Sequence, residues 1–371
     1  MKKLLLLTGL CLVLAGCGKN GAQWRPGQPL AREKLVVAVI HISDPLNERA
    51  GYAFEHDRGI REMREKTGLK EEQIIRKINV SDADPMVVEN ALRDCIALGA
   101  HIIFATSYGY METCEKLAAE FPNVIFAHAT GSRYNDTNFT NYFGRVYQAR
   151  YLSGIAAGLK TESNRLGYVA AMDKSNSEVS GGINAFALGV ESVNPGAVIH
   201  VRVTHSWFDP LGETTAAREL LALGCDVITQ HCDTPNPQAE AERAGKWSVG
   251  YNSDMSREAP GAVIGSVVWN WGEYYTYLVQ SVINGSFTTA PYFGGLREGI
   301  VDFTPLSALA APGTAEAVAA ARLRIESGGF NVFDGALETN DGRIIGEPGT
   351  TLPDALITGG IDWYYRNVRE R

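Results

Sequence analysis

The chain has 371 residues, of which 34 are basic and 42 acidic, so its formal net charge is −8, and 45 % of its residues are hydrophobic. The acidic balance and the lack of a basic patch exclude a nucleic-acid partner. A folded body of well over 300 residues exceeds what one hydrophobic core usually supports, so we expect two domains.

The chain begins with the features of an export signal. Lys2 and Lys3 precede an apolar run from Leu4 to Leu14, and the small residues Ala15-Gly16 then lead to Cys17. The run is far shorter than the roughly 20 residues that a membrane-spanning helix needs. We therefore expect residues 1–16 to be a lipoprotein signal peptide and Cys17 to be lipidated. A plain signal peptide with an incidental Cys17 is the alternative.

A tether is expected next, over residues 17–34, because Gly, Gln, Pro and Arg occur there without apolar periodicity. The folded body is expected to start near Leu35. Its four cysteines, Cys95, Cys114, Cys225 and Cys232, permit three complete disulfide pairings. We favour small buried hydrophobic roles for them, since an α/β protein of this size needs no disulfides.

The body contains an internal repeat. The same spacing of 125 residues separates Asp84-Pro85 from Asp209-Pro210 and Leu98-Gly99 from Leu223-Gly224. Each copy is typical of a strand, then a helix with an Asp cap and Pro in its first turn, then Gly and a buried strand. Strands that alternate with helices indicate parallel sheets, so the repeat predicts two similar Rossmann-like lobes.

We expect the first lobe to comprise residues 35–145 and about 266–298, and the second to comprise residues 146–265 and about 299–371. Chain crossings between the lobes, which form the hinge, are expected near Gly144 to Tyr147, Gly265 to Val268 and Gly299 to Phe303.

The loops after the strands are the candidate site, because ligands of open parallel sheets bind outside the carboxyl ends of the strands. In the first lobe these loops are residues 43–54, 106–110 and 129–132. In the second lobe they are residues 173–180, 206–208, 230–233 and 252–254.

These loops carry no catalytic motif: a phosphate-binding glycine loop, a nucleophile elbow and a zinc-binding helix motif are all missing from the sequence. His231, Cys232 and Asp233 have metal-ligating atoms, but consecutive residues of a strand point in different directions, so we expect no metal. The loops do carry Tyr52 and Trp207, whose exposure would gain little unless the rings contact a ligand. We expect no catalytic residue, no cofactor and a planar ligand between aromatic rings.

Several segments, in order along the chain, closely resemble the basic membrane protein family of purine-nucleoside-receptor-like lipoproteins. The resemblance covers residues 35 to about 287. Its segments include Gly51-Tyr52-Ala53-Phe54-Glu55-His56-Asp57, Thr106-Ser107-Tyr108-Gly109-Tyr110-Met111, His128-Ala129-Thr130-Gly131, Ser206-Trp207-Phe208-Asp209-Pro210 and Trp269-Asn270-Trp271-Gly272.

The resemblance implies a type I periplasmic-binding-protein fold and a substrate-binding lipoprotein that delivers a purine base or nucleoside to an ABC permease. It places the base between Tyr52 and Trp207. Asn252 stands where nucleoside-binding members have an Asp that holds ribose, and Trp269 stands where they have a Lys, so a free nucleobase, with adenine the first choice, is expected to bind more tightly than its nucleoside; the alternative is that Asn252 still holds ribose through one oxygen. The full set of predicted ligand-binding residues is Tyr52, Phe54, Ser107, Tyr108, Trp207, Asp233, Asn252, Asp254 and Trp269.

We expect a monomeric, exported protein that is lipid-anchored to the cell membrane on its periplasmic or extracellular face. Two alternatives remain. One is a ligand-sensing ectodomain that presents the same fold to a signalling receptor, and the other is a nucleoside hydrolase on the same α/β frame.

Overall fold

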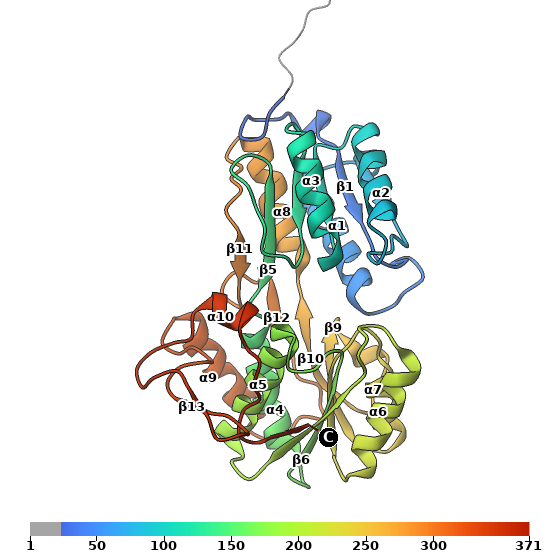
Figure 1. Cartoon of the computed structure of the whole chain (residues 1–371). Helices are drawn as coiled ribbons and strands as arrows, with labels where there is room; N and C mark the ends of the chain where they lie inside the picture. Colours follow the sequence, from blue (N-terminus) through green and yellow to red (C-terminus); the bar gives the residue numbers. More distant parts are fainter. Residues whose placement is uncertain (1–23, 371) are drawn as a thin grey trace, which may run out of the picture.

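A computed structural model describes residues 24–370, and Cys17 with the predicted signal peptide lies outside the described residues. The described chain builds two large sheets, each covered by helices on both faces, which form an N-terminal and a C-terminal lobe (Figure 1). Within the described residues, no helix is both long and apolar enough to cross a membrane.

The N-terminal lobe surrounds a six-stranded sheet of order β11-β5-β4-β3-β1-β2, in which all paired strands are parallel. Its strands are β1 (Val37–Ile40), β2 (Ile74–Lys77), β3 (Ile102–Ala105), β4 (Ile125–His128), β5 (Phe139–Gly144) and β11 (Tyr292–Gly294). Its helices are η1 (Arg32–Lys34), α1 (Tyr52–Thr67), η2 (Glu71–Gln73), α2 (Pro85–Ala97), η3 (Tyr108–Tyr110), α3 (Met111–Glu120) and α8 (Trp271–Asn284).

The C-terminal lobe surrounds a seven-stranded sheet of order β12-β10-β9-β8-β6-β7-β15, in which only β12 pairs antiparallel to its neighbour among the described strands. Its strands are β6 (Arg165–Ala170), β7 (Val198–Val203), β8 (Val227–His231), β9 (Trp247–Asn252), β10 (Val263–Trp269), β12 (Val301–Phe303), the short pair β13 (Leu337–Glu338) and β14 (Ile344–Ile345), and β15 (Val368–Glu370). Its helices are α4 (Val146–Lys160), α5 (Ser177–Val193), α6 (Pro210–Ala222), α7 (Asn236–Arg243), η4 (Met255–Arg257), α9 (Thr314–Glu326) and α10 (Asp354–Gly359).

Alternating side chains of the strands face different helix layers. In β1, Val37 and Val39 belong to one hydrophobic cluster, with residues of α1 and α8, whereas Ala38 and Ile40 belong to another, with residues of α2 and α3. This two-residue period explains why the strands are apolar throughout: both faces of a parallel sheet are buried. Cys95, Cys114, Cys225 and Cys232 are free and buried, which confirms their predicted hydrophobic role.

The two copies of the repeat have the predicted helix caps. The Asp84 side chain accepts a hydrogen bond from the Met86 backbone N–H at 2.9 Å, and Asp209 accepts one from Gly212 at 3.0 Å. Gly99 and Gly224 follow the helices at φ +88° and +83°, in the left-handed region that favours glycine.

The chain passes between the two sheets three times. The first passage joins β5 to α4 at Arg145, and the third joins β11 to β12. The second comes later than predicted, because β10 stays in the seven-stranded sheet to Trp269 before α8 begins in the N-terminal lobe. In Figure 1, α8 accordingly lies beside α1, although more than two hundred residues separate them.

The lobes also touch across the mouth of the cleft between them. The Gly51 backbone N–H, at the start of α1, donates to Ser253 Oγ of the C-terminal lobe at 3.2 Å. Gly51 has φ +106°, and a Cβ atom there would lie 2.5 Å from the Asp233 carbonyl oxygen. Only glycine therefore permits this approach of the lobes.

The contact of Gly51 with the C-terminal lobe can be tested by substitution. The substitution Gly51→Ala should separate the lobes and increase the radius of gyration measured by small-angle X-ray scattering. Gly99→Ala is the matched control, because Gly99 also has a positive φ but a Cβ there meets nothing within 4 Å. Equal radii for the two variants would show that the Gly51 contact does not hold the lobes together.

Candidate ligand-binding site

A cavity of about 350 Å³ lies between the lobes, at the carboxyl ends of the strands of both sheets. Parallel pairing places these ends at one edge of each sheet, and the two edges face each other. The cavity is lined by Ile42, Tyr52, Asp82, Ser107, Tyr108, Gly109, Thr130, Asn176, Glu178, Trp207, Asp233, Tyr251 and Asn252.

The wall from the N-terminal lobe carries two tyrosines. Tyr52 is the first residue of α1, and its ring meets the ring of His56 edge-on at 4.3 Å, while His56 in turn stacks on Trp271 at 4.3 Å. This packing fixes the Tyr52 ring at the cavity. Tyr108, in η3 after β3, keeps 64 % of its surface exposed.

The wall from the C-terminal lobe combines an indole ring with hydrogen-bond acceptors. Trp207, between β7 and α6, contacts the ring of His231 edge-on at 5.8 Å. The Asn252 Nδ2 donates to Asp233 Oδ1 at 2.8 Å, whereas the Asn252 Oδ1, on a side chain of a residue only 1 % exposed, has no hydrogen-bond partner in the structure.

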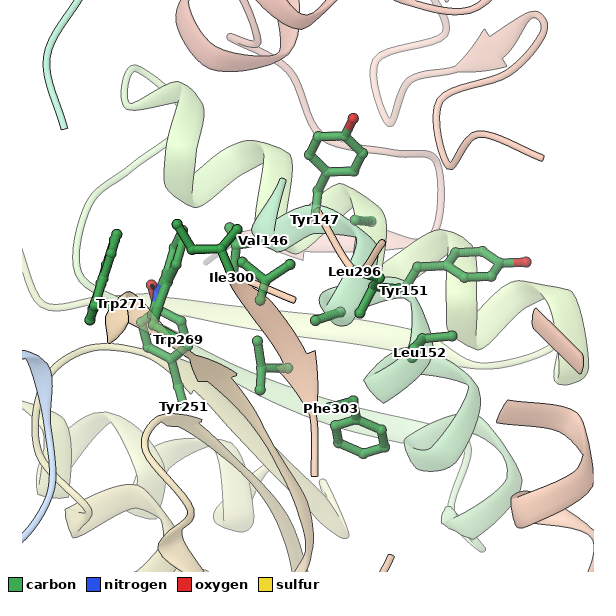
Figure 2. Packing of buried hydrophobic residues seen from close by; sticks show 14 of the residues in the cluster. Val146, Tyr147, Tyr151, Leu152, Tyr251, Trp269, Trp271, Leu296, Ile300 and Phe303 are labelled. Atoms are coloured by element: carbon green, nitrogen blue, oxygen red, sulfur yellow. Dashed lines mark hydrogen bonds between the residues drawn. The ribbon is translucent and has the colours of Figure 1, made fainter. Parts of the chain in front are cut away.

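A stack of two tryptophan rings contacts Tyr251 of this wall (Figure 2). Trp269 lies parallel to Trp271 with 4.4 Å between ring centroids, and its Nε1 donates to the Tyr251 hydroxyl at 3.2 Å. The guanidinium of the buried Arg150 sits 4.0 Å from the centroid of the Tyr251 ring. Tyr251 thus lies between Arg150 and Trp269, and its own ring lines the cavity.

Two carboxyl groups at the cavity are shifted toward their protonated forms. Burial raises the pKa of Asp233 to about 7, although the hydrogen bond from Asn252 opposes this shift. Burial and the negative charge of Asp233 raise the pKa of Glu178 to about 8, and the charge of Arg150 opposes this shift. Both shifts have the sign expected when acids leave water without a cation beside them.

A second cavity of about 270 Å³ adjoins the first and shares Tyr108, Thr130, Asn176 and Glu178 with it. Its far wall comes from α10, through Ile357, Thr358 and Gly359. The cleft thus has room beyond the aromatic walls of the first cavity.

The structure brings six of the predicted ligand-binding residues together around the first cavity and places three outside its lining. The six are Tyr52, Ser107, Tyr108, Trp207, Asp233 and Asn252. Phe54 lies under the Arg61 guanidinium, Asp254 accepts from the Ser256 backbone N–H to cap η4, and Trp269 is buried in the ring stack. The last placement puts the Trp269 Nε1 in hydrogen-bond contact with the Tyr251 hydroxyl, so Trp269 reaches the cavity only through Tyr251.

Seven lining residues were not singled out from the sequence: Asn176, Glu178, Thr130, Tyr251, Ile42, Asp82 and Gly109. The first three fall in predicted loops, but the sequence pattern around Asn176 and Glu178 is that of a helix start, and Asn176 does cap α5 through the Val179 N–H. Tyr251 lies within an apolar strand, where a ring is usually part of the core. The sequence did offer one signal for Glu178, because this residue lies in the loop that follows the first predicted strand of the second lobe.

The lining offers hydrogen-bonding and stacking groups from both lobes. Ser107 Oγ donates to Asp82 Oδ2 at 2.6 Å, and both residues line the cavity. The arrangement suits binding of a small ligand.

Comparisons with known proteins agree with this geometry. A purine-binding protein of Brucella abortus is 33 % identical over 346 residues, which cover 93 % of this chain and 96 % of that protein. A putative ABC transporter glucose-binding protein of Haloferax volcanii is 35 % identical over 274 residues, or 74 % of this chain and 68 % of that protein.

Among solved structures, an ABC transporter solute-binding protein of Conexibacter woesei matches with a TM-score of 0.66 at 20 % identity, over 80 % of this chain and 98 % of that one. This likeness confirms the predicted periplasmic-binding-protein fold. The model of the Bmp family, described as ABC transporter substrate-binding protein, PnrA-like, matches residues 35–323. The chain belongs to the Bmp family of ABC transporter substrate-binding proteins.

Proposed function

We propose that the protein binds a purine nucleobase, with adenine the first choice, or a purine nucleoside, and passes it to the permease of an ABC importer without changing it chemically. The observation that carries this proposal is the placement of Tyr52 and Trp207 on opposite lobes at one cavity whose remaining lining is mostly polar. The name of the Brucella relative, a purine-binding protein, supports the same ligand class.

Two aromatic rings facing one cavity suit a flat heterocycle. Stacking on an aromatic side chain contributes about 1–3 kcal/mol per base, and each lobe supplies a ring. The polar groups Ser107, Asp233 and Asn252 would then read the edge of the base. Because the rings come from different lobes, a ligand between them would also favour the closed arrangement in which Gly51 contacts Ser253.

Preference for the base over its nucleoside rests on Asn252. A carboxylate can accept from both vicinal hydroxyls of ribose, whereas the Asn252 amide has one acceptor oxygen, and its nitrogen already donates to Asp233. The adjoining cavity leaves space near the base, so hydrogen bonding and not volume sets this preference.

Proteins of this family work outside the cytoplasm, and we propose that this one is a monomer anchored to the cell membrane by a lipid on Cys17. Residues 24–34 of the predicted tether pack on the N-terminal lobe, where the Leu30 N–H donates to the Val282 carbonyl oxygen at 3.2 Å, so residues 17–23 remain the tether that we propose between the anchor and the lobes.

The stacking role of Trp207 can be tested with its neighbour as a control. Trp207→Ala should weaken adenine binding roughly 5- to 150-fold, the equivalent of one lost stacking face. Phe208→Ala removes an adjacent ring that is 63 % exposed and does not line the cavity, and it should leave the affinity unchanged. Equal adenine affinities for the two variants, measured by titration calorimetry, would rule out the stacking site.

Calorimetry of the wild-type protein with adenine, hypoxanthine, guanine and their nucleosides tests the ligand class. We expect adenine to bind most tightly and each base to bind more tightly than its nucleoside. D-glucose belongs in the same series because of the name of the Haloferax relative. Nucleosides that bind tenfold more tightly than their bases would overturn the base preference, and glucose binding without purine binding would overturn the purine proposal.

The anchor is tested by fractionation. Cys17→Ser removes the thiol that acylation requires, so the variant should appear in the soluble fraction with unchanged affinity for its ligand. Retention of the variant in the membrane fraction after its signal peptide has been removed would contradict lipidation at Cys17.

A further inference from the structure

Two acidic residues of the C-terminal lobe, Glu178 and Asp233, line the first cavity beside Asn252, whose Nδ2 donates to Asp233. None of the described residues that line the cavity is a lysine or an arginine. Because carboxyl groups that leave water need hydrogen-bond donors, this wall suits a ligand that supplies N–H groups.

The ionisable groups around Glu178 do not provide a cation that pairs with its carboxyl group. His231 Nε2 lies 3.5 Å from Glu178 Oε1, but burial lowers the pKa of His231 well below its usual value. Arg150 is the cation on the neighbouring helix α4, and it donates to the Gln230 carbonyl at 2.7 Å, with its guanidinium against the Tyr251 ring. The other ionisable groups that interact with Glu178 come from α1, β6, β9 and the loop after β8: Tyr52, Tyr168, Tyr251 and Asp233.

Aromatic rings complete the surroundings of this acceptor wall. Tyr52, Tyr251 and Trp207 line the same cavity as Glu178 and Asp233. Rings attract a cation through their electron-rich faces, and a carboxylate binds an N–H cation about twice as strongly as it binds a neutral donor. Rings and carboxylates around one cavity are together the chemistry that recognises an organic cation.

We propose that Glu178 and Asp233 hold an N–H-rich edge of the ligand: an amidinium cation, or the amino group and adjacent ring nitrogen of a neutral aminopurine. The inference rests on the proposed purine site and names the group by which that site selects among purines. For a neutral aminopurine, the protonated carboxyl donates its O–H to the ring nitrogen and its carbonyl oxygen accepts from the amino group, so no covalent bond breaks. A permanent cation instead displaces the carboxyl proton into the solvent.

The raised pKa values of Glu178 and Asp233 support a carboxyl group that holds a proton before the ligand binds. At pH 7 a carboxyl whose pKa is about 8 still holds its proton in the empty cavity, so it can donate this proton in a hydrogen bond to a neutral ligand or release it when a cation binds. Binding of a permanent cation should accordingly strengthen as the pH rises through 8, where the carboxyl ionises without help from the ligand.

The first experiment compares purines that differ in their amino groups. At pH 7, calorimetry should show that affinity decreases from 2,6-diaminopurine to adenine to hypoxanthine, with at least about a tenfold difference between 2,6-diaminopurine and hypoxanthine. Xanthine should bind most weakly, because it forms an anion most readily. Glu178→Gln keeps the shape of the side chain but cannot ionise, and it should reduce this range to about twofold. Asp209→Asn is the matched control, since it removes one acidic charge of the same lobe at a helix cap that Asn also serves.

The second experiment uses benzamidine, a planar cation. Its binding enthalpy, measured at pH 7 in two buffers of different ionisation enthalpy, should reveal release of close to one proton, and Glu178→Gln should abolish this release. If Glu178 had only a structural role, its substitution would not change the number of protons released. Thermal melting checks that the variants fold. Asp233→Asn is used in place of Glu178→Gln if the latter unfolds.

The outcomes separate the two proposals. Benzamidine binding with proton release, but without purine binding, would keep the cation site and remove the purine assignment. Purine binding with hypoxanthine equal to or tighter than 2,6-diaminopurine, or an order that Glu178→Gln leaves unchanged, would overturn the role proposed for Glu178 and leave the purine site intact.

Discussion

Parallel pairing of the strands is the constraint on which the rest of the structure depends. It requires a crossover between paired strands, in most cases through a helix, and it brings the strand-to-helix turns to the same edge of each sheet. The two lobes present these edges to each other, so that residues far apart in the chain, such as Tyr52 and Trp207, line one cavity. The cleft is therefore a product of the topology, and the side chains of a few turns decide what it binds.

Much of this arrangement could be predicted because local signals repeat. Asp84 and Asp209 cap equivalent helices, Gly99 and Gly224 end them, and the buried strands are apolar on both faces. These features depend on short-range hydrogen bonding and on burial, both of which leave a pattern in the sequence. The loops that follow the strands were predicted as the site because ligands of open parallel sheets bind outside the carboxyl ends of the strands.

The parts that could not be predicted depend on contacts between distant elements. The family resemblance led us to expect Trp269 among the ligand-binding residues, but it stacks on Trp271 and donates to Tyr251, a placement set by side-chain packing. Glu178 begins a helix, where a carboxylate usually serves the helix end, and its exposure to the cavity depends on elements of both lobes. The strand β15 joins the sheet edge beside β7 although only three residues long, too few for a periodic signal.

We propose that aromatic rings of the cleft bind the face of a ligand and that acceptors of the C-terminal lobe bind its edge. A crystal structure of the protein with adenine tests this claim most directly. We expect the ring between Tyr52 and Trp207, with its amino group directed toward Glu178 and Asp233. Adenine bound elsewhere, or bound in the cavity with its amino group toward the N-terminal lobe, would contradict the account.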